Sequence, residues 1–125
     1  SFAQTMTSSN FKAYNSYADS GGVQNQSDAA LSDDTTFQSL GATSQGISNA
    51  ANSSINALLY LIAPSNTSFF KNFYSQSSFI YYSSPIYEMN DWVEGNVKNT
   101  AAITQIRFQM SSGNFTGNID MYGIA

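Results

Sequence analysis

The chain has 125 residues, the size of one ordinary domain. It contains neither cysteine nor histidine, which excludes disulfides, thiolate or histidine zinc sites and the Ser-His-Asp triad. Only 10% of the residues are charged, the net charge is −4, and the four basic residues are scattered, so no nucleic-acid partner is expected. The longest apolar run, 57–63, is far shorter than the roughly 20 residues of a membrane span, so no membrane insertion is expected.

The first 54 residues are mostly small and polar, which predicts long loops with short structured pieces. Aromatic residues spaced by three within 10–20 favour a short amphipathic helix, and a strand remains the alternative. The Asp-Ser-Gly-Gly sequence at 19–22 predicts a turn. A helical turn is expected near Leu31 or Phe37.

From residue 55 the sequence is typical of β-structure. The apolar run 55–64 is short and ends at a proline, which favours a strand buried on both faces. A turn is expected at 64–67. The aromatic-rich segment 68–84 predicts another strand, with a bend at 75–78.

Alternation of apolar and polar residues is clearest towards the C-terminus. In 86–99, Val93 and Val97 are expected on one face of a strand, and Trp92, Glu94 and Asn96 on the other. In 105–110, the residues expected to point inward are Ile106, Phe108 and Met110, and those expected to face solvent are Gln105, Arg107 and Gln109. After a turn at 111–114, the core positions are Ile119 and Met121, with Tyr122 on the other face. These segments predict a C-terminal hairpin whose core includes Phe108.

Short strands separated by Gly, Ser and Asn turns are typical of an antiparallel β-sandwich. The predicted fold is therefore all-β, a single sandwich domain over 1–125 with long polar loops in its N-terminal half.

Acidic residues supply the few candidates for catalysis or metal binding. They are the pairs Glu88 with Glu94 and Asp91 with Asp120 as a glycosidase-like couple, and Asp28, Asp33 and Asp34 as calcium ligands. The loop aspartates match no known calcium-loop spacing, and solvated turns or helix capping by Ser32 or Asp33 explain them better. We therefore expect no enzyme activity, no catalytic or cofactor-binding residue, no metal and no cofactor.

A group of aromatic residues in the second half is the remaining candidate site. Its members are Tyr74, Phe79, Tyr81, Tyr82 and Tyr87, with the amide of Gln76 among them. Aromatic rings beside amides are what lectins use to stack sugars, but such residues more often form a core or a subunit interface. The core or interface interpretation is favoured, and sugar stacking stays open.

The end of the chain also matches a known pattern, I-x-x-I-R-F-x-x-S-S-G-N, a few residues, then G-x-I-x-hydrophobic-Y-G-I. The matching residues are Ile103, Ile106, Arg107, Phe108, Ser111, Ser112, Gly113, Asn114, Gly117, Ile119, Met121, Tyr122, Gly123 and Ile124. In this, 100–125 resembles the C-terminus of a group of bacteriophage virion structural proteins from phages of marine bacteria and cyanobacteria. The segments 10–22, 35–42 and 59–73 are similar to the middle of those proteins, in the same order.

The resemblance implies a virion component with a jelly-roll-like β-sandwich: a tail fibre, a head fibre or a capsid decoration protein. It implies a homotrimer that packs on other virion proteins and is assembled in the bacterial host cytoplasm. The alternative function is an adhesin module of a tail fibre that binds a host receptor or cell-surface glycan. Members of the group have further strands before the point where this chain begins. Two alternatives therefore stay open: the chain is the C-terminal part of a longer protein, or it borrows strands from a neighbour.

Overall fold

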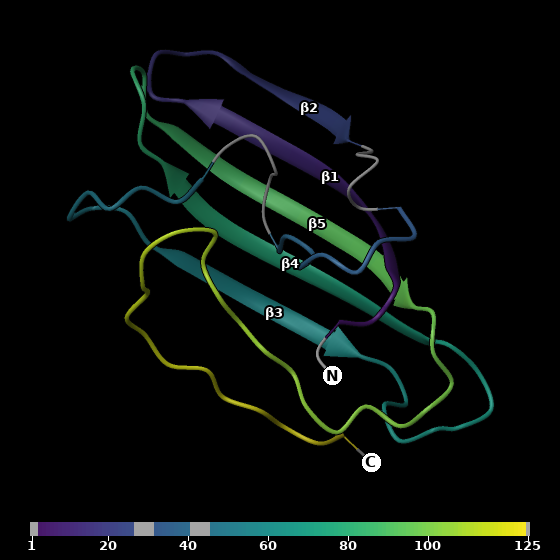
Figure 1. The fold of residues 1–125 in the computed structure, drawn as a ribbon. Helices are drawn as coiled ribbons and strands as arrows, with labels where there is room; N and C mark the ends of the chain where they lie inside the picture. Colours follow the sequence, from purple (N-terminus) through teal and green to yellow (C-terminus); the bar gives the residue numbers. More distant parts are fainter. Residues whose placement is uncertain (1–2, 27–31, 41–45, 125) are drawn as a thin grey trace.

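The structure, a computed structural model, describes residues 3–26, 32–40 and 46–124. These residues form one five-stranded antiparallel sheet and no helix, which confirms the all-β class (Figure 1). The strands are β1 (Met6–Ser16), β2 (Gly21–Gln26), β3 (Ile55–Leu61), β4 (Lys71–Tyr81) and β5 (Tyr87–Val97). Their order across the sheet is β2-β1-β5-β4-β3, so the long central strand β5 joins the N-terminal pair to the other two strands. Nothing in these residues has the length and hydropathy of a membrane-spanning helix.

The two faces of the sheet differ in what lies over them. The covered face consists of the even-numbered side chains of β1 and the odd-numbered ones of β3, β4 and β5. The loop 32–40 reaches it through a hydrogen bond of 2.8 Å from the Ser77 hydroxyl to the Leu40 carbonyl, and Ile47 and Ile103 pack on its apolar residues. The open face carries the odd-numbered side chains of β1 and the even-numbered ones of β3, β4 and β5, most of them at least partly exposed.

The apolar core on the covered face is small. Its fully buried members form two clusters, Phe79 with Met89, and Phe73 with Val93 and Val97. Polar and charged side chains fill the rest of the buried positions: Ser8, Asn10, Lys12, Ser16, Lys71, Ser75, Ser77 and Asp91. Buried charges need partners, and the Lys71 ammonium donates to the carbonyls of Asn99, Thr100 and Ala101 at 2.5–3.2 Å. Lys12 and Asp91, of opposite charge, are cross-strand partners in the ladder.

The molecule exposes more surface than a compact chain of its mass. Its accessible surface is 8477 Å², against about 6,600 Å² expected for a compact monomer of 13.6 kDa. Many large apolar side chains are exposed, and most of these lie on the open face or in 101–124.

The N-terminal prediction of a short helix is wrong, and the strand alternative is confirmed. Residues 10–16 belong to β1, which pairs with β5 along its whole length and with β2 over 10–15. Cross-strand pairing on both sides outweighs the three-residue spacing of the aromatics, because local pattern is a weak determinant next to tertiary pairing. The predicted turn at 19–22 is present one to two residues earlier, with Asp19 at a positive φ of 60°. No helical turn forms at Phe37, and Leu31 lies outside the described residues.

Two predictions for the middle strands also need correction. β3 is a strand as expected, but it lies at the edge of the sheet and is not buried on both faces: Leu58 is 59% exposed. β4 is a continuous strand without a bend at 75–78, because it pairs with β3 and β5 through those residues. The turn after Ala63 and the two faces of β5 are confirmed, with Val93 and Val97 buried and Trp92 and Glu94 on the exposed side.

The largest correction concerns the predicted C-terminal hairpin. The described residues after Val97 form no strand, although the chain turns at 111–113 with Gly113 at a φ of 70°. Phe108 and Ile106, expected in the core, are 36% and 44% exposed, and Met121 is 88% exposed. The polypeptide there is exposed and has the sequence pattern of a strand, but no neighbouring edge pairs with it. The described residues thus form one sheet and not the two sheets of a complete sandwich.

Candidate functional site

The open face of the sheet carries a row of aromatic rings, which we call the aromatic stripe: Phe11, Trp92, Tyr74 and Tyr60. Phe11 and Trp92 are cross-strand partners on β1 and β5, with ring centroids 5.6 Å apart. Tyr74 and Tyr60 are partners on β4 and β3 and stack at 4.5 Å with an interplanar angle of 12°. Trp92 is the cross-strand partner of Gln76, which is two residues from Tyr74 on β4. Trp92 and Tyr74 are therefore diagonal neighbours, and such positions on adjacent strands are typically about 7–8 Å apart.

Neutral amides and carboxylates alternate with the rings. Gln76 lies between Trp92 and Leu58 in the register, and Glu94 lies between Ser9 and Tyr74. Asn90 and Asn96 are also on this face of β5, half-buried. The stripe therefore combines flat apolar surfaces with hydrogen-bonding groups at their margins.

No basic side chain is part of the open face of the strands. All four basic residues of the chain lie in its described part. Lys12 and Lys71 are buried on the covered face, Lys98 is paired with Asp33, and Arg107 lies 5.5 Å over the ring of Phe37. The face consequently offers only carboxylates and neutral polar groups, which disfavours anionic ligands.

The predicted aromatic group is divided between several surroundings. Phe79 is in the core, and Tyr81 and Tyr87 pack against it, which confirms the core interpretation for these three. Tyr74 is on the open face, and Tyr82 is 48% exposed at the end of β4. The structure does not assemble the five residues into one platform.

A small hollow lies at the end of the covered face where Tyr81 and Tyr87 meet Tyr14. Its volume is about 270 Å³, and Gln24 and Met89 also line it. The rings contact one another edge-on or tilted, with Tyr14 and Tyr87 centroids 6.0 Å apart. Since these tyrosines are packed on the core residues Phe79 and Met89, we assign the hollow to core packing rather than to a ligand site.

The carboxylate pairs considered for catalysis are not brought together. Glu88 and Glu94 are on the same face of β5 but six residues apart, which is about 20 Å along a strand. Glycosidase couples are separated by only about 5–9.5 Å. Asp91 is buried within the sheet, whereas Asp120 is exposed in the C-terminal segment.

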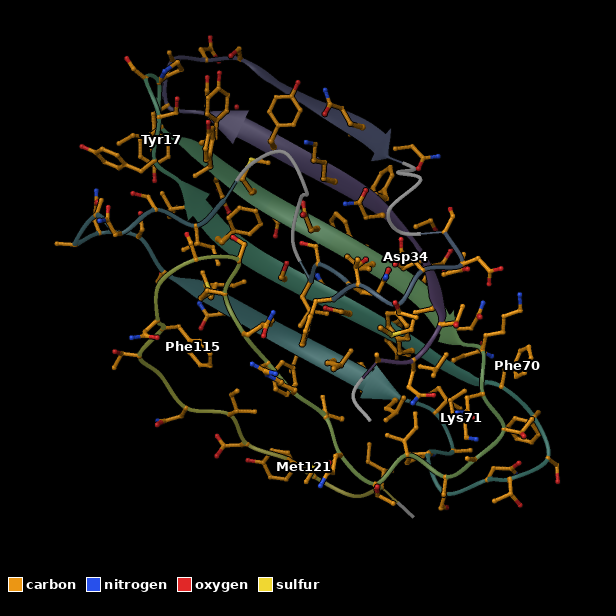
Figure 2. The ribbon with its side chains drawn as sticks, in the orientation of Figure 1. Tyr17, Asp34, Phe70, Lys71, Phe115 and Met121 are labelled. Atoms are coloured by element: carbon orange, nitrogen blue, oxygen red, sulfur yellow. The ribbon has the colours of Figure 1, made fainter. Side chains whose placement is uncertain are left out.

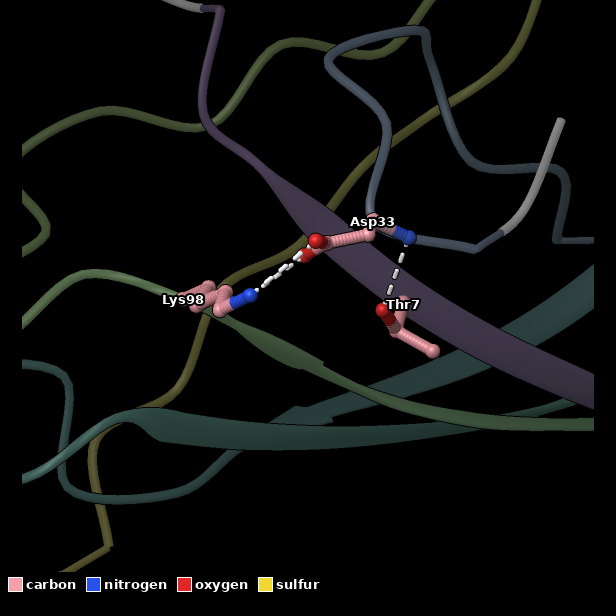
Figure 3. Close-up of polar contacts among 3 residues, drawn as sticks. All are labelled: Thr7, Asp33 and Lys98. Carbon is pink, nitrogen blue, oxygen red and sulfur yellow. Dashed lines mark hydrogen bonds and ion pairs between the residues drawn. The ribbon is translucent and has the colours of Figure 1, made fainter.

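The loop aspartates considered for calcium are engaged in other contacts. The Asp33 carboxylate accepts hydrogen bonds from the Lys98 ammonium at 2.8 and 3.0 Å, and its backbone N–H donates to the Thr7 hydroxyl at 2.9 Å (Figure 3). A carboxylate oxygen of Asp34 accepts from the Thr36 N–H. Asp28 lies outside the described residues, no helix for Ser32 or Asp33 to cap begins there, and the described part of the chain holds no group of three metal-ligating side chains.

The C-terminal segment, 101–124, is the second notable surface. It runs as an extended trace that turns back on itself beside the sheet (Figure 1), and Figure 2 labels Phe115 and Met121 on it, at the margin of the molecule. Ile103 anchors its start, by a 2.8 Å hydrogen bond from its N–H to the Pro64 carbonyl and by packing on the Phe73 cluster. Beyond that anchor its large apolar side chains are mostly exposed: Ile106, Phe108, Phe115, Ile119, Met121, Tyr122 and Ile124.

Three members of the aromatic stripe were not singled out from the sequence as site residues. The alternation within 86–99 had already placed Trp92 opposite the core, but nothing in the sequence paired it with Phe11, more than 80 positions earlier. That juxtaposition depends on the β1–β5 ladder, whereas the sequence favours a helix over 10–20 and leaves a strand only as the alternative.

Comparison with known proteins adds nothing to this geometry. No family model, no curated protein and no solved structure matches the chain.

Proposed function

We propose that the chain is a non-enzymatic structural subunit that acts by packing on copies of itself, as a fibre or capsid decoration module of a bacteriophage virion. The observation that carries this proposal is the C-terminal segment, in which most of the large apolar side chains beyond Ile103 are 36–88% exposed. Exposed apolar surface of this extent is uncommon on soluble monomers and marks interaction sites. The phage assignment rests on the sequence resemblance.

The segment has the sequence pattern of a strand but no neighbouring strand among the described residues to which it is hydrogen-bonded. Residues 105–110 alternate apolar and polar side chains, and their backbone groups belong to no ladder of the described chain. An edge strand of a neighbouring subunit would supply the hydrogen bonds, and the neighbour's side chains would cover Ile106 and Phe108. In this arrangement the segment contributes to the second sheet of a jelly-roll-like sandwich that is completed between subunits.

The surface area supports association between subunits. The chain exposes about 1,900 Å² more than a compact monomer of its mass. A standard interface takes about 800 Å² from each partner, so the excess is large enough to include such an interface. Each subunit of a closed ring has two interfaces, and the smallest such ring is the homotrimer that the resemblance implies.

Sedimentation equilibrium of the full chain tests the self-association. We expect a trimer for the natural sequence and a monomer for the double variant Ile119→Asp, Met121→Asp, because each added charge would be desolvated in the contact. The control is Tyr17→Asp, a substitution of a side chain that is 71% exposed in the β1–β2 turn, which should leave the trimer intact. A natural sequence that stays monomeric at high micromolar concentration would contradict the proposal.

A separate measurement tests the virion assignment. The polypeptide should be found in purified phage particles, assembled in the bacterial host cytoplasm, and antibodies against it should label the capsid or the tail in electron micrographs. Its location would distinguish decoration from a fibre. Particles that lack the polypeptide would refute the virion role while leaving the self-association result unaffected.

A further inference from the structure

The open face of the sheet has no role in the proposed packing. The C-terminal segment is anchored at the covered-face side, where Ile103 packs on the Phe73 cluster and Arg107 lies over Phe37, a residue of the loop that crosses that face. The aromatic stripe is on the opposite side of the sheet. Its four residues are 37–47% exposed, so part of each side chain is accessible to a ligand.

We propose that the aromatic stripe is a binding site for a neutral glycan chain. The four rings are contributed by four adjacent strands, which at about 4.8 Å per strand gives a length of about 15 Å across the sheet. This length suits an oligosaccharide rather than one sugar. The stacked, nearly parallel rings of Tyr60 and Tyr74 and the tilted pair of Phe11 and Trp92 offer two apolar patches separated by a diagonal step.

The chemistry of the stripe matches that of a pyranose chain. Each sugar ring has apolar C–H surfaces, which suit an aromatic face, and a rim of hydroxyl groups, which need hydrogen-bond partners. Gln76 and Glu94 lie in the register beside Trp92 and Tyr74, one on each side of the diagonal step. An amide both donates and accepts, and a carboxylate accepts strongly from hydroxyl groups.

Charge selects a neutral glycan over other ligands with flat or apolar groups. A nucleic acid or an anionic polysaccharide needs basic side chains, and the strands present none on this face. A purely apolar protein partner would leave the amide and carboxylate groups between the rings desolvated without compensation. A ligand whose hydroxyl groups alternate with apolar ring faces meets both requirements.

The position of Trp92 makes the test specific. It is the only tryptophan of the chain, so intrinsic tryptophan fluorescence reports on the stripe alone. The full chain is screened on an array of neutral oligosaccharides, and fluorescence titration is then done with the best-bound probe and with dextran sulfate. We expect a shift in tryptophan emission that saturates with the neutral probe, and no response to dextran sulfate. Failure to bind any neutral glycan on the array, or stronger binding to dextran sulfate, would overturn the proposal.

Single substitutions locate the site without using fluorescence. Tyr74→Ala and Gln76→Ala should each weaken binding of the selected glycan about tenfold in calorimetry, the effect of about 1.4 kcal/mol of lost contact. The matched control is Tyr82→Ala, a tyrosine of similar exposure beyond the end of β4, which should bind normally. Unchanged affinity in both stripe variants would overturn the assignment of the site.

Sedimentation of the same variants separates this proposal from the one on assembly. The stripe variants should remain trimeric while losing the glycan, and Ile119→Asp, Met121→Asp should lose the trimer while keeping the glycan response of Trp92. If the stripe variants dissociate the trimer instead, the open face is a subunit contact and the glycan site is refuted. If no trimer exists for any sequence, the assembly proposal fails and the glycan titration still decides this one.

Discussion

The central strands and the C-terminal segment carry the same kind of sequence but differ in how they are held. β5 alternates buried and exposed side chains and is hydrogen-bonded on both sides, to β1 and to β4. Residues 105–110 alternate as regularly, yet they have no ladder in the described structure and most of their apolar side chains are exposed. Alternation therefore predicts an extended segment with one apolar face, while the existence of a ladder depends on a free edge that the sequence pattern does not reveal.

Two phenylalanines, one from each region, differ in what they contribute to the free energy of folding. Phe79, on β4, is 3% exposed and packs on Met89, whereas Phe108, in the C-terminal segment, is 36% exposed. In a single subunit, only the first contributes the full free energy of a buried aromatic side chain. The second can contribute it only when another surface covers it.

The largest expected effect is the difference between these two residues in a subunit that does not assemble. In the Ile119→Asp, Met121→Asp background, Phe79→Ala should lower the free energy of unfolding by about 3–5 kcal/mol, the range for emptying a buried aromatic site. Phe108→Ala should lower it by only about 1–2 kcal/mol, because about a third of the side chain is already hydrated. Urea denaturation followed by circular dichroism measures both. Equal losses would mean that Phe108 is a core residue of the isolated subunit.

Replacing a glycine by alanine should have an intermediate effect on the free energy of unfolding, and the effect should differ between β5 and the C-terminal segment. A Cβ on Gly95, in β5, would meet the Thr7 carbonyl oxygen and come within 2.7 Å of the Phe73 ring, whereas one on Gly117 would meet nothing. Gly95→Ala should therefore destabilise the fold by about 1–3 kcal/mol through overpacking. Gly117→Ala, the control, should stay within about 0.5 kcal/mol. Thermal unfolding of both variants measures the difference. Similar melting temperatures would show that the residues around Gly95 shift to accommodate the added Cβ.

The strands from β3 onward could be predicted because their local pattern and their tertiary role agree. Val93 and Val97 alternate with Trp92 and Glu94, and β5 has one covered and one exposed face as that pattern requires. The burial of β3 was predicted wrongly, since a continuous apolar run does not distinguish a central strand from an edge strand that faces a partner.

The N-terminal strand and the aromatic stripe could not be predicted for a related reason. The covered face of β1 is polar, with Ser8, Asn10 and Lys12 buried, so it lacks the apolar alternation by which a strand is recognised. Its burial depends on cross-strand partners such as Asp91, nearly 80 residues away. The stripe combines β1 with β5 and β4 with β3, and so it could not be found before the strand order was known.

The smallest expected effect concerns the ion pair between the loop 32–40 and the end of β5. Lys98 and Asp33 have side chains 49% and 59% exposed, so their attraction is largely screened, and the Thr7 hydroxyl still accepts the Asp33 N–H when the charges are removed. A double-mutant cycle with Asp33→Asn and Lys98→Gln should give a coupling of about 0.2–1 kcal/mol that declines with added salt. Asn is chosen because it tolerates the positive φ of 55° at this position. A coupling of several kcal/mol that resists salt would mean that the pair is buried in the assembled form, which would place this end of the sheet, as well as the C-terminal segment, in the subunit contact.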